Sequence, residues 1–133
     1  MQVSGIDLRE DHPEAVRIGD RETSCRVRDI LSRIGDKWSL TVIHELGGGP
    51  RRFTELRQGI PAISQRMLTV TVRGLERDGL LTRTVHATVP PRVDYALTPL
   101  GHTLYDKVWA LVTWALDHVD EVATAQDTYD TRT

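Results

Sequence analysis

The stretch that decides the fold is residues 53–81, FTELRQGIPAISQRMLTVTVRGLERDGLL. Thr54 can cap a short helix that Gly59 ends, and the residues after Gly59 suit a tight turn. Ser64 can cap a longer helix that runs to about Asp78. A short helix, a tight turn and a longer helix form a helix-turn-helix, whose second helix enters the major groove of DNA. The stretch therefore predicts a DNA-binding unit.

A β-hairpin is predicted directly after this unit. Residues 80–88 are rich in β-branched side chains, and residues 92–97 suit a returning strand after a Pro-Pro turn. Because proline cannot pair inside a sheet, this turn should be an exposed tip. Thr98 followed by Pro99 is the preferred start of a final helix. The chain is therefore expected to be mainly α with a small β-hairpin wing, a winged helix-turn-helix.

Two further helices are expected before residue 53. Ser24 can cap the first, which runs to about Ile34, and the second begins at Asp36 or Lys37. A Gly-Gly-Gly-Pro run then breaks the chain. The final helix is expected to end at about Val122.

Length and composition bound the organisation of the chain. It has 133 residues, of which 39% are apolar and 27% charged, as in ordinary globular proteins. We predict one winged-helix domain over residues 23–123, including a C-terminal dimerisation helix. A flexible acidic arm over 1–22 should precede it, and a frayed polar tail over 124–133 should follow. With neither a signal peptide nor a membrane-spanning stretch visible, we expect a cytoplasmic protein without a membrane partner.

The positive charge of the chain is concentrated in one segment. Residues 51–92 carry eight arginines and three acids, a net charge of +5, whereas the whole chain has a formal net charge of −2. Such an asymmetry is typical of a surface that binds a polyanion. Its overlap with the helix-turn-helix makes double-stranded DNA the expected partner. The arginines are Arg51, Arg52, Arg57, Arg66, Arg73, Arg77, Arg83 and Arg92.

The helix that begins after Ser64 carries groups that can contact bases. Arginine pairs with guanine and glutamine with adenine, which suits Arg66 and Gln65, and Thr69 can offer a hydroxyl or contact a thymine methyl. Arg73 lies further along and suits a phosphate. The alternative is an ordinary solvated helix face with scattered arginines. The preceding turn and the following hairpin favour DNA.

Contacts to the DNA backbone are also expected around this helix. Ser64 stands at its N-terminus, where free N–H groups favour anions. Arg92 follows the Pro-Pro tip and can reach phosphates or a narrow minor groove. The alternative for Arg92, equally allowed by the hairpin alone, is an incidental arginine in a β-turn. Arg52 and Thr54 complete the predicted set.

The final helix carries more apolar surface than packing on the protein's own core can cover. One stripe can pack on the protein's own core, and a second stripe then needs a partner. A homodimer on an inverted-repeat DNA site is the simplest answer. The alternative is a core helix wrapped on all sides by its own domain, which so short a chain disfavours. We assign dimerisation to Leu104, Val108, Trp109, Leu111, Val112 and Ala115.

The single cysteine, Cys25, cannot form an intrachain disulfide and suits a reducing cytosol. Its expected place near a helix N-terminus, beside Arg26 and Arg28, favours a reactive thiolate. The alternative is a small buried side chain that is chemically inert. The histidines lack metal-binding spacing and no catalytic or cofactor motif is visible, so we expect no metal, no cofactor and no enzyme.

Five strings of residues, in this order, resemble the HxlR-type winged helix-turn-helix transcription regulators, distant relatives of the MarR group. The resemblance covers about Cys25 to Leu116 and implies a homodimer joined through its terminal helices. It also implies a recognition helix from Ser64 to Asp78. Several redox-sensing members of the family carry a cysteine at the position of Cys25. The strings are GDKWSL (35–40), RFTEL (52–56), ISQRMLT (63–69), LERDGLL (75–81) and VPPRVDYALT (89–98).

The sequence thus predicts a homodimeric, sequence-specific, DNA-binding transcription regulator, with a response to oxidants or to a ligand left open. The alternative is a dimeric redox or small-molecule sensor that acts through protein contacts without binding DNA. The +5 charge of residues 51–92 argues against this alternative.

Overall fold

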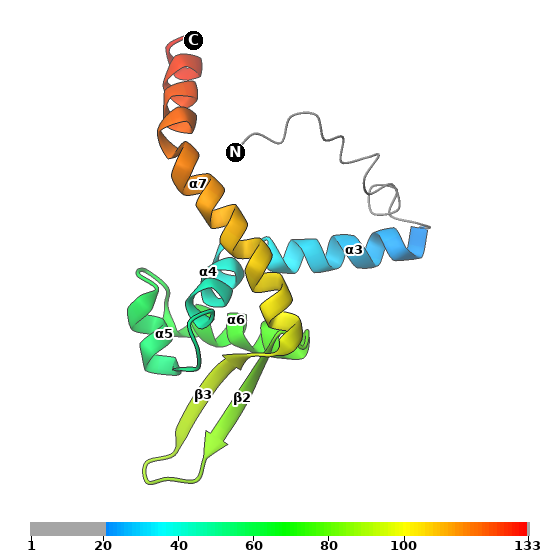
Figure 1. Ribbon diagram of the computed structural model, residues 1–133, viewed down its shortest axis with the longest axis vertical. Coiled ribbons are helices and arrows are strands. Elements are labelled where there is room, and N and C mark those ends of the chain that lie inside the picture. The colour runs from blue at the N-terminus through cyan, green and yellow to red at the C-terminus, as the bar shows by residue number, and fades with distance from the viewer. Residues whose placement is uncertain (1–20, 133) are drawn as a thin grey trace. The chain divides into compact units, whose positions relative to one another are not determined.

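The computed structural model describes residues 21–132 (Figure 1). The chain divides after Asp36 into two compact units. Among the described residues the first unit contains one helix, α3 (Arg21–Ile34), in which no residue is buried. The predicted flexible arm falls mainly on residues 1–20, which lie outside the described residues. Its last two residues, 21 and 22, belong to α3.

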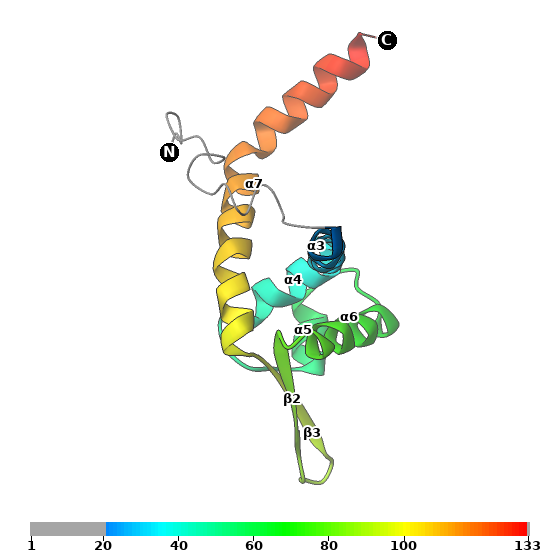
Figure 2. The ribbon, with the colours of Figure 1, turned by 90° about the vertical axis from the view of Figure 1, so that its right-hand side faces the viewer.

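The second unit holds all the other described elements. They are α4 (Lys37–Leu46), β1 (Arg51–Arg52), α5 (Phe53–Gly59), α6 (Gln65–Arg77), β2 (Leu81–His86), β3 (Arg92–Leu97) and α7 (Pro99–Thr131). Strand β3 lies between β1 and β2 and is antiparallel to both. The β2–β3 hairpin extends away from the helices as a wing (Figures 1 and 2). With α5 and α6 as the helix-turn-helix, this is the predicted winged helix-turn-helix.

Helix α4 is the centre of the core of this unit. It packs against α5, α6, α7 and β3, and its residues Val42 and Ile43 are fully buried. Two glycines allow close approach of the surrounding chain. Gly47 lies against the ring of Tyr105, and Gly101 lies against the carbonyl of Leu80, so closely that neither position has room for a side chain.

Three local signals of the sequence are confirmed. Ser64 caps α6, because its Oγ accepts a hydrogen bond from the Met67 N–H at 3.0 Å. Gly79 follows α6 with a φ of +79°, in the left-handed region that glycine tolerates. Thr98 caps α7, with Pro99 in the first turn. The Thr98 hydroxyl also donates to the Gly79 carbonyl at 2.6 Å, which ties the end of the α6 region to the start of α7.

The start of α5 differs from the prediction. The helix begins at Phe53, so Thr54 lies inside it and does not cap it. Glu55 instead accepts a hydrogen bond from the backbone N–H of Arg52 at 2.8 Å. Strand β1, which precedes α5, was not predicted at all. It exists because β3, far along the chain, pairs with it, and a two-residue strand carries no periodic signal of its own.

The ends of two helices also differ from the prediction. Helix α3 begins at Arg21, so Ser24 is inside the helix and not at its cap. Helix α7 continues to Thr131, so most of the tail that we expected to fray is helical. No glycine or proline follows Gly101 in the sequence, and a helix once formed propagates through such residues at little cost.

Candidate nucleic-acid interface

The two faces of α6 separate as the sequence predicts. Leu68 and Leu75 are fully buried against the core. Gln65, Arg66 and Arg73 are exposed. Figure 2 shows α6 beside the base of the wing. The helix therefore presents a polar, cationic face next to the hairpin.

The two hydroxyl residues of this region are already engaged within the helix. Thr69 is half-buried, and its Oγ1 donates to the Gln65 carbonyl at 2.9 Å. Its methyl group and an oxygen lone pair remain available to a base. Ser64 accepts from the Met67 N–H, so its own hydroxyl proton remains available to an anion.

A cleft separates α6 from the base of the wing; we call it the α6–wing cleft. Its volume is about 320 Å³, and Arg73 lines it from α6 while Arg83 lines it from β2. Neither guanidinium forms an ion pair with another residue that the structure describes. Two such groups, from two elements, suit the binding of a phosphate. The cleft is also lined by Thr69, Val72, Glu76 and Tyr95.

Arg83 is a candidate binding residue that no motif had marked. It is paired in register with Tyr95 of β3, which is buried. Paired residues of antiparallel strands point to the same face of the sheet. Residues two apart on a strand share a face, so Arg83 lies on the same face of β2 as the buried Leu81. The alternation of the strand indicates this orientation from the sequence alone.

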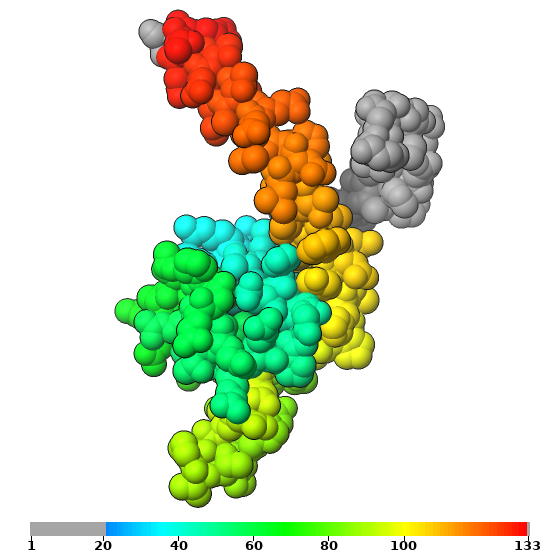
Figure 3. Space-filling view, turned by 60° about the vertical axis from the view of Figure 1, so that its left-hand side comes forward, coloured from blue at the N-terminus to red at the C-terminus, as the bar shows by residue number. Residues whose placement is uncertain are grey.

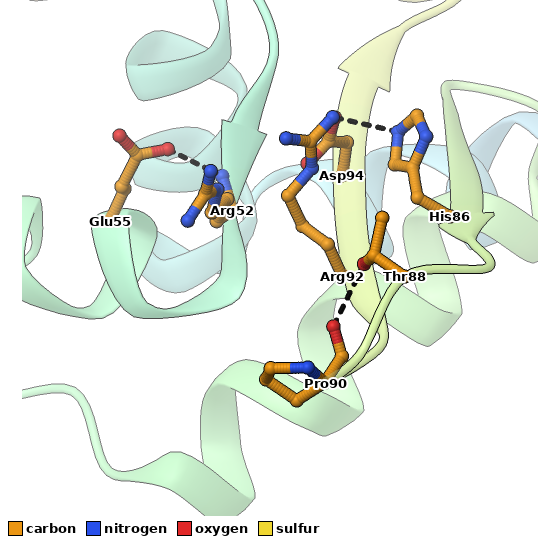
Figure 4. Close-up of polar contacts among 7 residues, drawn as sticks. All are labelled: Arg52, Glu55, His86, Thr88, Pro90, Arg92 and Asp94. Carbon is orange, nitrogen blue, oxygen red and sulfur yellow. Dashed lines mark hydrogen bonds and ion pairs between the residues drawn. The ribbon is translucent and has the colours of Figure 1, made fainter.

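Three residues that we predicted to contact the DNA backbone come together around a second hollow. It has a volume of about 500 Å³, with Arg52 and Thr54 on one side and Arg92 of the wing on the other. Figure 4 shows the side chains of Arg52 and Arg92 between β1 and β3. Residues from separate parts of the sequence thus form one cationic surface.

Asp94 holds Arg92 in place. The Arg92 Nε lies 3.4 Å from Asp94 Oδ1, an ion pair without hydrogen-bond geometry. The other carboxylate oxygen lies 2.9 Å from His86 Nε2 (Figure 4). Asp94 was not predicted to take part in the site. Its spacing of two from Arg92 places both on one face of β3, which is the face opposite to that of Tyr95 and Arg83.

The expected dimerisation residues divide between the core and the surface. Val108 is 2% exposed and packs inside its own unit, so it belongs to the core and its assignment to a dimer interface is corrected. The helical period of α7 is consistent with Val108 either in the core or in a dimer interface. The packing of α7 against α4 places this part of the helix in the core. The other five are less covered: Leu104 and Val112 are half-buried, and Trp109, Leu111 and Ala115 are exposed.

The apolar stripe of α7 that contains the buried Val108 continues along the part of the helix that lies beyond the core. About three and four turns further along α7, Val119 is 59% exposed and Val122 is 43% exposed. Leu116, on the neighbouring stripe, is 71% exposed. Figure 3 shows the C-terminal half of α7 standing clear of α4 to α6. This half of the helix has an apolar side that none of these helices covers.

Cys25 lies in the second turn of α3, with its side chain exposed. The interpretation of Cys25 as a buried packing residue is therefore wrong. Within residues 21–132 no group of three or more histidine, cysteine or acidic side chains is placed to hold a metal ion. None of the helices described is long and apolar enough to cross a bilayer.

Comparison with known proteins places this architecture in a family. The model of the HxlR-like helix-turn-helix matches residues 33–123. The uncharacterized HTH-type transcriptional regulator YdeP of Bacillus subtilis is 39% identical over 129 residues, 95% of this chain and 94% of YdeP. The structure of the transcriptional regulator ytfH from Salmonella typhimurium superposes with a TM-score of 0.72 at 35% identity, over 76% of this chain and 90% of that one. The structure of the redox regulator HypR in its reduced form superposes with a TM-score of 0.69 at 38% identity, over 74% of this chain and 98% of HypR. The chain belongs to the HxlR family of helix-turn-helix transcriptional regulators, a family of regulators and not of enzymes.

Proposed function

We propose that this regulator binds a specific operator in double-stranded DNA as a homodimer. Membership of a helix-turn-helix family implies DNA binding. The observation that carries the proposal is the exposed face of α6, which carries Gln65, Arg66 and Arg73, on a helix that lies beside the base of the wing (Figure 2). The protein must work where the chromosomal DNA is, for which we propose the cytoplasm.

The N-terminal half of α6 contacts bases in this proposal. Arg66 donates two hydrogen bonds to guanine O6 and N7, and Gln65 pairs with adenine N6 and N7. Thr69 offers its methyl group and an oxygen lone pair, since its proton is bound to the Gln65 carbonyl. Ser64 and the free N–H groups at the start of α6 bind a phosphate.

The wing holds the DNA backbone from two sides. Arg83 acts with Arg73 across the α6–wing cleft. Arg92 acts with Arg52 and Thr54 around the second hollow, on the opposite face of the hairpin. A hairpin with arginines on both faces suits insertion into the minor groove, which has phosphates on either side.

A gel-shift selection on fragmented genomic DNA tests the proposal. The fragments include the region upstream of the protein's own gene, and non-specific DNA is present in excess. At least one fragment should bind about a thousandfold more tightly than the competitor. Equal affinity for all fragments at physiological salt would contradict sequence-specific binding. A dimer that binds no DNA would favour the sensor that acts through protein contacts.

Removing the Arg83 guanidinium should weaken binding to every DNA sequence alike. Arg83→Gln removes one phosphate contact per protomer, so the slope of log K against log salt should fall by roughly 0.9 per site. Binding isotherms at several salt concentrations measure this slope. Lys107→Gln removes a positive charge from the exposed surface of α7 and should leave the slope unchanged. An unchanged slope in Arg83→Gln would mean that the α6–wing cleft holds no phosphate.

The homodimer is supported by the uncovered apolar side of α7. Leu111 and Val119 are each more than half exposed, at 53% and 59%, and the exposed residues continue to Val122. A second copy of the helix, related by two-fold symmetry, can cover this side. The two recognition helices then meet two half-sites of an inverted repeat.

A response to oxidants through Cys25 is favoured by two observations. The thiol is exposed on α3, and the similar protein HypR is described as a redox regulator. With one cysteine in the chain, the products are an intermolecular disulfide, a mixed disulfide with a small thiol, or a higher oxidation state. A Cys25–Cys25 bridge requires Cα atoms within about 7 Å across the two-fold axis.

Diamide treatment should change the operator affinity of the parent protein and leave Cys25→Ser unaffected. The added bulk or cross-link on α3 changes the relative positions of the two protomers, with an expected effect of roughly fivefold or more, in the usual range of coupling between sites. Fluorescence anisotropy of a labelled operator measures both proteins in parallel. An equal response of the two proteins, or none in either, would exclude Cys25 as the sensor.

A further inference from the structure

A valine stands within the cationic face of α6. Val70 is 59% exposed. It follows Arg66 by four residues and precedes Arg73 by three, and this spacing places all three side chains on one side of the helix. The core of the unit does not use Val70, because α6 packs inward through residues such as Leu68 and Leu75.

Helix stability does not account for a valine at this position. A β-branched residue is a weaker helix former than the long polar residues that usually occupy an exposed helix site. A single exposed apolar residue is ordinary on a protein surface. What distinguishes Val70 is its place, in the middle of α6, the second helix of the helix-turn-helix, and between two arginines on the same side of that helix.

We propose that Val70 contacts the 5-methyl group of a thymine and so selects a T·A pair at one position of each operator half-site. The inference rests on the proposed function. The thymine methyl is the apolar group that the major-groove edges of the base pairs display, the others being hydrogen-bond donors and acceptors. Thr69 extends the apolar contact. Its hydroxyl is bound to the Gln65 carbonyl at 2.9 Å, which leaves its methyl group free.

Uracil-substituted operators test this contact, because deoxyuridine differs from thymidine only by the missing 5-methyl group. Each thymine of one half-site is replaced in turn, and binding is measured for the parent and for Val70→Ala. The parent should lose about fourfold in affinity at one position, the value expected for one buried methyl group. Val70→Ala should bind the thymine operator more weakly and lose nothing further at that position.

Leu100→Ala is the matched control. Leu100 is an apolar residue that is exposed to a degree similar to that of Val70, 56%, but it lies in the first turn of α7 and not on α6. Both variants change exposed side chains, and their thermal unfolding should match that of the parent. Leu100→Ala should keep the fourfold loss at the sensitive thymine.

Two results would overturn the inference and leave the proposed function standing. One is a parent that binds its operator without loss at any uracil position. The other is a Val70→Ala protein that is as sensitive to the same methyl group as the parent. A parent that selects no operator at all would overturn the proposed function itself, and this inference with it.

Discussion

Arg66→Ala is expected to lower the discrimination between operator and non-specific DNA by roughly 5- to 150-fold per half-site. A bidentate contact to guanine is worth about 1–3 kcal/mol of discrimination. Non-specific affinity comes almost entirely from phosphate contacts, so it should change much less. Arg66 is exposed in the first turn of α6, where recognition helices contact bases. Competition binding with operator and random duplexes measures the ratio.

Arg73→Ala is the matched control, since it removes the same side chain from the same face of α6. Arg73 lines the α6–wing cleft and should contact a phosphate. Its loss should weaken all sequences alike and reduce the salt slope by roughly one unit per site. If Arg66→Ala retains the selectivity of the parent, the assignment of base contacts to this face is wrong.

Glutamate at both Leu111 and Val119 is expected to convert the dimer into monomers. These apolar side chains are 53% and 59% exposed in the single chain. In a symmetric dimer each substitution occurs twice. Losing this burial and introducing four charges should raise the dimer dissociation constant by on the order of a thousandfold or more. Sedimentation velocity measures the association state, and operator affinity should fall with it.

Ala110→Glu controls for the added charge. Ala110 is exposed on α7 and lies about half a turn of the helix away from Val108 and Val119. The variant should remain dimeric and bind the operator. A double variant that stays dimeric, or a stable monomer of the parent that binds the operator normally, would contradict dimerisation through the apolar side of α7.

The parts of the fold that depend on short-range interactions were predictable from the sequence. Ser64 and Thr98 cap helices because their hydroxyls reach N–H groups three residues away. Gly79 ends α6 because the chain needs a positive φ there. Strand β1 was not predictable, since its two residues are a strand only through pairing with β3.

In the candidate site, too, features that depend on local sequence were predictable and features that depend on long-range packing were not. The helical period assigned Arg66 and Arg73 to one face of α6, and both are exposed. The helical period also places Val70 on this face, but its significance depends on its exposure, which the structure gives. The α6–wing cleft depends on how α6 packs beside β2, so Arg83 entered the site only with the structure. The place of Val108 in the core could be assigned only once the contact between α4 and α7 was known.

The central claim is that a two-fold symmetric dimer recognises a specific DNA sequence through α6 and the wing. The most direct measurement is a hydroxyl-radical footprint of the parent protein on the tightest-binding genomic fragment. The account predicts two protected half-sites that form an inverted repeat, with centres about 10 bp or a multiple of 10 bp apart. Protection without two-fold symmetry, or protection spread evenly along the fragment, would contradict it.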